Sequence, residues 1–170
     1  KVNFGQMIKR KQGVVDQTVE GVQYLMKKNK IDVYTGIGSF EDEHTLKISG
    51  EKEEKIKGKN FIIATGSKPT ELPFAKFDKE RIISSTEALA LKEQPKKLLV
   101  IGGGIIGLEL GSVYQRIGTE VEVIEFMDRI IPTFDGAMSK ELTKSLKKLG
   151  IKINVKHKVT EVSRDGDKVT

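Results

Sequence analysis

From residue 97 onward, apolar and polar positions follow one another in an order that predicts alternating strands and helices. An apolar run at 97–101 leads into a glycine-rich turn, and a segment of helical period follows at 104–117. Gly118 ends that segment, and a second apolar run occupies 120–125. Two short apolar runs joined by a helix-length segment are typical of a βαβ unit, in which the strands lie parallel and the helix covers one face. We therefore predict a parallel α/β unit here.

The same alternation continues further along the chain. Asp135 is placed to cap a second helix, which ends at Gly150 and carries an apolar stripe. The stripe consists of Met138, Leu142, Leu146 and Leu149. Alternation at 151–155 then predicts a third strand with one polar face, and 159–169 begins a hairpin that turns at Asp165-Gly166.

The first part of the chain has a different pattern. Apolar residues recur at helical spacing from Phe4 to Met26, which predicts a long helix that Gly13 interrupts. The period then changes, and strands are predicted at 33–40 and 45–48, followed by a turn at 49–51. The charge run from 52 to 57 is interpreted as a solvent-exposed face.

A second group of signals lies between these two parts. The apolar run Phe61–Ala64 predicts a strand buried on both faces, and the segment 65–69 that ends it must turn sharply. Two of the four prolines lie within 69–82, which we interpret as a connection between domains. Ser84 or Ser85 then caps a short helix.

The glycine-rich turn carries the most specific chemistry. Gly102-x-Gly104-x-x-Gly107 joins a strand to a helix, and Glu125 ends the next strand, 18 residues after Gly107. In this dinucleotide-binding fingerprint the first glycine permits the turn, the second lets the backbone approach a pyrophosphate, and the third lets the helix lie close to the sheet. Free amides at the helix start attract phosphates, and Glu125 is placed to accept hydrogen bonds from the adenosine ribose. An ordinary strand-to-helix turn is the alternative, but the flanking elements occur in the required order, so the predicted cofactor is NAD.

Composition narrows the class of protein. With 170 residues, 37% apolar and 32% charged, the chain is typical of a water-soluble protein with one ample domain or two small ones. No apolar run approaches the roughly 20 residues that a membrane helix needs, and no signal-peptide core is present, so neither a membrane nor secretion is expected.

Charge and cysteine content exclude further classes. The net charge of +6 comes mostly from scattered lysines without interleaved aromatic residues, so nucleic acid is not an expected partner. The chain contains no cysteine, which excludes disulfide and thiolate chemistry within it. Neither His44 nor His157 has a second ligand at metal spacing, so no metal site is predicted.

Two motifs in this order, Ala64-Thr65-Gly66-Ser67-x-Pro69 and Gly102-x-Gly104-x-x-Gly107-x-Glu109, resemble those of the flavoprotein disulfide reductases. The stretches 83–89, 105–114 and 118–121 are most similar to the dihydrolipoyl dehydrogenase branch of that family. The resemblance runs over essentially the whole chain. It implies an α/β chain with the FAD/NAD(P)-binding fold, in which a Rossmann-like NAD-binding domain is preceded by part of an FAD-binding domain.

The resemblance also assigns domains and site residues. Residues 1–78 would be the later part of the FAD-binding domain, and residues 79–170 would be the first two-thirds of the NAD-binding domain. The residues that would contact FAD are Gly38, Thr65, Gly66 and Ser67. Those that would hold NAD are Gly102, Gly103, Gly104, Ile105, Ile106, Gly107, Leu108, Glu109 and Glu125, with Val159 near the adenine. The alternative for 65–67 is a strand-ending turn, and the alternative for Glu109 is a carboxylate in a helix's first turn, stabilised by the dipole.

Complete members of the family have features that this sequence lacks. These are an N-terminal glycine fingerprint for FAD, a redox-active cysteine pair, and a C-terminal His–Glu pair that acts as acid and base across a homodimer. The chain begins at Lys1 without an initiator methionine, and we expect it to be a fragment. The resemblance implies a parent oxidoreductase that passes electrons from dihydrolipoamide through FAD to NAD+, with this chain alone inactive.

The expected partners and location follow from the same resemblance. Partners would be the remainder of the polypeptide and the lipoyl domains of 2-oxoacid dehydrogenase or glycine cleavage complexes. The location would be the cytoplasm or, in a eukaryote, the mitochondrial matrix. The alternatives are another member of the family, such as an NADH oxidase or mercuric reductase, and a self-contained nucleotide-binding module without catalysis.

Overall fold

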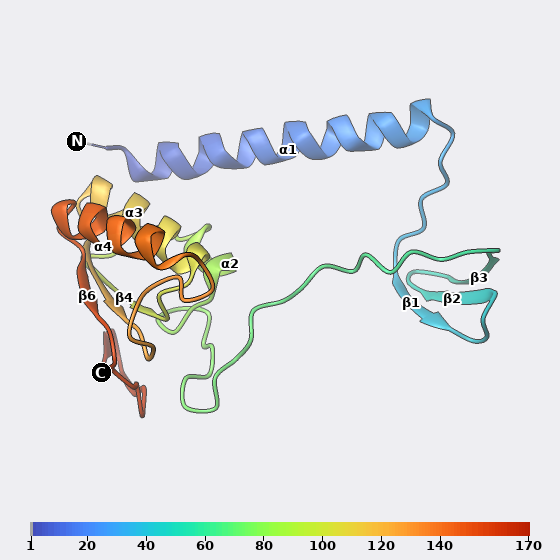
Figure 1. Ribbon diagram of the computed structural model, residues 1–170. Helices are drawn as coiled ribbons and strands as arrows, with labels where there is room; N and C mark the ends of the chain where they lie inside the picture. Colours follow the sequence, from blue (N-terminus) through green and yellow to red (C-terminus); the bar gives the residue numbers. More distant parts are fainter. Residues whose placement is uncertain (1) are drawn as a thin grey trace. The chain divides into compact units, whose positions relative to one another are not determined.

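The computed structural model describes residues 2–170, and contacts divide the chain into two units. One unit comprises the residues up to Arg10 together with Pro69–Thr170, and the other comprises Lys11–Lys68. The larger unit contains the predicted α/β elements (Figure 1). The domain boundary expected between residues 78 and 79 stays a prediction.

A three-stranded parallel sheet forms the centre of the larger unit. Its strands are β4 (Lys97–Ile101), β5 (Glu120–Ile124) and β6 (Lys152–Asn154), in the order β4-β5-β6. Helices α3 (Ile105–Ile117) and α4 (Gly136–Lys148) lie on one side of this sheet (Figure 1). All five elements were predicted from the sequence, and the α/β fold class is confirmed.

The two faces of the sheet differ most clearly at β5, where buried valines alternate with glutamates. Val121 and Val123 are fully buried beneath the helices. On the opposite face Glu120 pairs with Lys97 at 3.6 Å and with Lys152 at 3.1 Å. The polar face predicted for the third strand therefore continues onto β5 but not along β4, where Leu99 and Ile101 lie on the same face.

Glycine allows α3 to lie close to the strands and to end cleanly. A Cβ atom added at Gly107 would lie 2.8 Å from Cγ1 of Val100, and one at Gly111 would lie 3.3 Å from Cγ1 of Val121. Close helix–sheet approach at these two positions is thus confirmed. Gly118 ends the helix in the left-handed conformation, with φ +105°.

Helix α4 follows its predicted limits but not all of its predicted stripe. The Asp135 side chain accepts a hydrogen bond from the Ala137 N–H and caps the start of the helix. Leu146 is buried, and Leu142 and Leu149 pack against the same core. Met138 is 61% exposed, which the stripe did not predict. In the first turn the buried position belongs instead to Ser139, which is 2% exposed and donates to the Ile130 carbonyl at 2.7 Å.

The short helix α2 (Ser85–Ala88) has the cap that the sequence predicted. Ser84 is its N-cap, and Glu87 completes a capping box by accepting from the Ser84 N–H and hydroxyl. These hydrogen bonds to Ser84 lower the pKa of Glu87. Residues 69–82, predicted as a connection, contain no helix or strand other than an isolated bridge between Leu72 and Ala75.

The predicted final hairpin is shorter than expected. Strands β7 (Arg164–Asp165) and β8 (Lys168–Val169) pair antiparallel around a turn at 166–167. Ser163 and Thr170 exchange two further backbone hydrogen bonds at 2.9 Å, but residues 159–163 are not in a strand, and the Val162 N–H bonds to the Phe74 carbonyl.

Charged side chains connect this hairpin to the connecting segment. Arg164 contacts Asp78 at 2.8 Å and Glu80 at 2.7 Å, and Arg81 pairs with Asp167. Burial opposes ionisation of Asp78, but backbone N–H groups at 80–82 and the Arg164 guanidinium outweigh it and lower its pKa well below the usual range.

Helix α1 (Phe4–Lys28) is continuous, so the interruption predicted at Gly13 was wrong. A single internal glycine costs a helix only about 1 kcal/mol relative to alanine, which 25 residues can offset. At the start of the helix Phe4 is buried against Tyr114, with ring centroids 6.2 Å apart.

The smaller unit contains an antiparallel sheet in the order β1-β2-β3. Its strands are β1 (Ile37–Phe40), β2 (Thr45–Ser49) and β3 (Glu53–Lys57). Strand β1 is shorter than the predicted 33–40. The charge run from 52 to 57 is mostly exposed, as predicted, but most of it also forms strand β3, which was not predicted. Its charges pair across the ladder, with Lys47 bonded to Glu53 at 2.7 Å.

The prediction of a buried strand at Phe61–Ala64 was wrong. The segment has no strand structure, and Ile62 and Ile63 are 93% and 74% exposed. A strand of this kind requires neighbouring strands and covering layers. No described residue pairs with this segment as a strand.

No helix within residues 2–170 is both long and apolar enough to cross a membrane.

Candidate dinucleotide-binding site

The glycine-rich turn lies at the carboxyl end of β4, where the chain enters α3. Gly102 adopts φ +99°, a conformation that favours glycine, and its N–H bonds to the Ile124 carbonyl of the adjacent strand at 2.8 Å. Gly104 is the N-cap of α3, and no side chain caps this end of the helix. The first N–H groups of a helix have no acceptor within it, so this end offers hydrogen-bond donors to a ligand.

The three fingerprint glycines differ in their surroundings. A Cβ atom at Gly104 would meet nothing within 4 Å, whereas one at Gly107 would clash with Val100. The open space at Gly104 would allow a ligand to approach the backbone. The tight packing at Gly107 brings the helix into contact with the sheet. The geometry of each position thus fits the role that the sequence predicted for it.

Glu125 lies beside the turn and is 7% exposed. Its Oε2 accepts the Gly103 N–H at 2.5 Å, and its Oε1 accepts the Met127 N–H at 2.6 Å. Each carboxylate oxygen has further lone-pair capacity, so a ribose hydroxyl remains a compatible partner. The sequence placed Glu125 at the end of the strand but did not predict that it holds the turn itself.

The sequence also missed the segment Ile130–Ile131, which covers the middle of the turn. The Ile131 N–H donates to the Gly103 carbonyl at 2.8 Å. The Ile130 side chain is fully buried, and its Cγ2 would lie 2.9 Å from a Cβ at Gly103. Two isoleucines before a proline indicate burial, but no sequence pattern indicates this contact.

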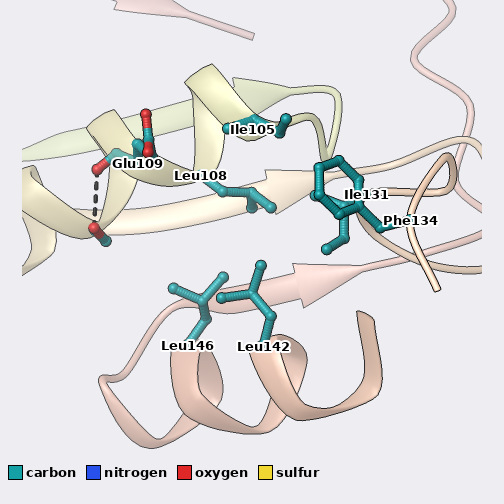
Figure 2. A pocket seen from close by; sticks show the side chains of 8 residues that line it. Ile105, Leu108, Glu109, Ile131, Phe134, Leu142 and Leu146 are labelled. Carbon is teal, nitrogen blue, oxygen red and sulfur yellow. Dashed lines mark hydrogen bonds between the residues drawn. The ribbon is translucent and has the colours of Figure 1, made fainter. Parts of the chain in front are cut away.

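An apolar cavity of about 270 Å³ adjoins the first turns of α3 (Figure 2). Leu142 and Leu146 of α4 point toward Leu108 of α3 across this space (Figure 2). Glu109 is the charged residue of its lining. It lies one turn into α3, which begins at Ile105, so the alternative that placed it in the first helical turn was wrong.

The remaining predicted NAD residues lie in the first turn of α3 or, in the case of Val159, after β6. Ile105 and Ile106 are 49% and 61% exposed, whereas the Leu108 side chain is 3% exposed in the core. Val159 is half-buried and follows His157, whose N–H bonds to the Glu125 carbonyl.

The predicted FAD residues belong to the smaller unit. Gly38 lies in β1 opposite Ile48, and the segment 65–67 is exposed, with Gly66 at φ +69°. Their roles stay predictions.

The two histidines make local contacts. His44 Nδ1 lies 3.1 Å from the Gly58 carbonyl, and His157 Nδ1 lies 2.7 Å from the Val155 carbonyl. Within residues 2–170, no group of three or more histidines, cysteines or acids could hold a metal ion.

A parallel sheet, a glycine turn entering a helix and an acid ending the next strand define a protein with the FAD/NAD(P)-binding fold. The family model described as pyridine nucleotide-disulphide oxidoreductase matches residues 2–170. The chain therefore belongs to this family of flavoprotein disulfide reductases, as its motifs predicted.

Curated relatives indicate the branch of the family. The chain is 46% identical to the dihydrolipoamide dehydrogenase of Chaetomium thermophilum over 172 residues, covering 99% of this chain and 34% of that protein. It is 46% identical to the mitochondrial dihydrolipoyl dehydrogenase of Schizosaccharomyces pombe, with the same coverage. It is 43% identical to dihydrolipoyl dehydrogenase 3 of Pseudomonas putida, covering 99% and 37%. The chain thus spans about a third of the length of these relatives, and the predicted resemblance is confirmed.

Solved structures show the same fold. The HOCl-induced flavoprotein disulfide reductase RclA of Escherichia coli matches with a TM-score of 0.85 and 26% identity, over 99% of this chain and 39% of that one. LpdA of Mycobacterium tuberculosis matches with a TM-score of 0.91 and 24% identity, with the same coverage.

Proposed function

We propose that this chain is the central, NAD-binding part of a dihydrolipoyl dehydrogenase. The observation that carries the proposal is the glycine turn, with open space at Gly104, tight packing at Gly107 and the Glu125 carboxylate beside it. Residues 79–170 would form most of the NAD-binding domain. Residues 1–78 would be the later part of the FAD-binding domain, in which Gly38, Thr65, Gly66 and Ser67 would contact FAD.

The residues of the turn fit a bound dinucleotide. The N–H groups at the start of α3 would donate to the pyrophosphate, and Gly104 would let it approach the backbone. Glu125 would accept from the adenosine ribose, and Glu109 would lie toward the nicotinamide. When bound, NAD+ supplies the hydride acceptor, and the part of the protein is to orient it.

The full activity would belong to the parent protein. Relatives named dihydrolipoyl dehydrogenase at 43–46% identity support oxidation of protein-bound dihydrolipoamide, with FAD and NAD+ as cofactors. A homodimer, lipoyl domains of 2-oxoacid dehydrogenase or glycine cleavage complexes, and a cytoplasmic or mitochondrial location belong to the same proposal. Intact mass and terminal sequencing of the natural polypeptide test it, since we expect a chain about three times as long as this one. A natural polypeptide of 170 residues would instead favour a self-contained binding module.

The isolated chain should not oxidise dihydrolipoamide. Oxidation of this dithiol requires a disulfide of the enzyme that accepts its two electrons, and this chain has no cysteine to form one. NADH formation would be followed by absorbance, with a complete dihydrolipoyl dehydrogenase assayed in parallel. Turnover by the pure chain would show that the assignment of the redox step is wrong.

The chain should bind NAD more tightly than NADP. A 2′-phosphate would approach the buried Glu125 carboxylate and meet a like charge with little water to screen it. Glu125→Arg should move the preference toward NADP. Both affinities should fall, because arginine cannot accept the Gly103 and Met127 N–H groups.

Calorimetry with both cofactors measures this preference. Glu120→Gln is a control, since Glu120 is the first residue of β5, at the end of the strand away from Glu125. Equal or tighter binding of NADP by the unmodified chain would contradict the assignment of Glu125.

A further inference from the structure

We infer that Ile131, anchored through Ser139, is a positioning residue that aims the Gly104 N–H at the dinucleotide. This inference rests on the proposed NAD site and assigns a function to the segment Ile130–Ile131, which no motif of the sequence marks.

The hydrogen bonds of Gly103 set the orientation of the turn. Its N–H is taken by Glu125 Oε2 at 2.5 Å, and its carbonyl accepts the Ile131 N–H at 2.8 Å. The Gly103–Gly104 peptide is trans, so its N–H points away from its carbonyl. Because Ile131 holds that carbonyl, the Gly104 N–H points away from Ile131, and it makes no hydrogen bond within residues 2–170.

These hydrogen bonds determine which N–H groups of the turn remain able to donate to a pyrophosphate. The N–H groups of Gly102 and Gly103 are occupied by Ile124 and Glu125. The N–H of Gly104 is the first along the turn that has no such acceptor among residues 2–170. Gly103 would then serve the site by its orientation and not by direct contact with phosphate.

The backbone of Ile131 is held in an unfavourable conformation. Its φ of +40° is rare for a β-branched residue, and a following proline also favours extended backbone. Such strain persists only where the surroundings fix it, and it is concentrated at functional sites. Here the Phe134 N–H bonds to the Ile131 carbonyl, and Arg129 Nη2 bonds to the Pro132 carbonyl at 2.9 Å.

Ser139 connects this segment to α4. Its hydroxyl donates to the Ile130 carbonyl at 2.7 Å, and the serine is 2% exposed. Removal of the Ser139 hydroxyl deprives the Ile130 carbonyl of its donor. It should loosen the segment Ile130–Ile131 without changing any residue of the glycine turn. Ser139 is therefore the position at which positioning can be tested without altering the glycines.

The test compares Ser139→Ala with Thr143→Ala. Thr143 lies one turn along the same helix, and among residues 2–170 its hydroxyl bonds to the Ser139 carbonyl alone, so its loss spares the segment Ile130–Ile131. NADH affinity would be measured by calorimetry well below both melting temperatures. We expect Ser139→Ala to weaken NADH about five- to tenfold, the effect of losing one buried hydrogen bond, and Thr143→Ala to change it less than about twofold.

Nuclear magnetic resonance provides a readout that general destabilisation does not move. In the unmodified chain we expect scalar coupling across the hydrogen bond from Ile131 N–H to Gly103 carbonyl. NADH should shift the Gly104 amide more than the Gly103 amide. In Ser139→Ala the coupling should decrease, and in Thr143→Ala it should not.

The outcomes are distinguishable. NADH affinity unchanged in Ser139→Ala, equal weakening in both variants, or a larger shift at the Gly103 amide overturns the positioning role alone. Failure of the unmodified chain to bind NADH overturns the proposed function, and this inference with it.

Discussion

Gly104→Val is expected to abolish NAD binding and to leave the fold intact. The valine side chain would project into the open space through which the pyrophosphate must approach the backbone. The backbone at Gly104, with φ −80° and ψ 169°, is extended and suits a β-branched residue, so the turn can form. Calorimetry would measure the affinity, and circular dichroism would follow the secondary structure.

Gly21→Val is a suitable control for this variant. A Cβ at Gly21 also meets nothing within 4 Å, and the residue lies in α1, outside the glycine turn. This control should bind NAD as the unmodified chain does. Unchanged NAD affinity in Gly104→Val would mean that the turn is a structural turn only, and the proposed function would fail.

Gly107→Val is expected to destabilise the fold itself. Its Cβ would lie 2.8 Å from Val100 Cγ1 and 3.3 Å from the Gly102 carbonyl oxygen, and valine adds two methyl groups beyond that atom. Overpacking of this kind costs about 3 kcal/mol, a large part of the total stability of a domain. The midpoint of thermal unfolding should fall by about 10 °C.

Gly111→Ala provides a graded comparison on the same face of α3. Its Cβ would lie 3.3 Å from Val121 Cγ1, a contact that small shifts can relieve. We expect a smaller loss than in Gly107→Val. If Gly107→Val unfolds at the same temperature as the unmodified chain, α3 does not depend on close contact with β4.

The α/β elements could be predicted because their signals are local. The spacing of apolar residues, the glycines that end helices and the N-cap Asp135 can each be recognised from neighbouring residues. The elements that they define pack on one another within this chain. The segment Phe61–Ala64 shows the opposite case. Its apolar residues are those of a buried strand, but a strand forms only beside a partner strand, and the described residues do not supply one. Strand β3 was missed because its pairing depends on the ladder with β2 and not on apolar alternation.

The candidate site divides in the same way. The glycines and Glu125 could be located because their spacing is fixed by the strand–turn–helix path. The hydrogen bonds that hold the turn could not be predicted. They join Gly103 to residues 22 and 28 positions away, and they depend on how the chain after β5 folds back. A left-handed isoleucine before a proline runs against local preference, so only tertiary contacts can specify it.

The charged contacts between Arg164 and the segment 78–82 have a consequence for how acid affects this part of the molecule. The pKa of Asp78 is depressed, so the stability it contributes is fully present above the pKa of an unfolded aspartate, declines as pH falls below that value, and is lost at the lower folded pKa. Mild acid therefore leaves Asp78 ionised and its contact with Arg164 in place. The contact between Arg164 and Asp78 therefore persists under acidity that already neutralises ordinary carboxylates, and added salt, which screens exposed charges, weakens it at neutral pH.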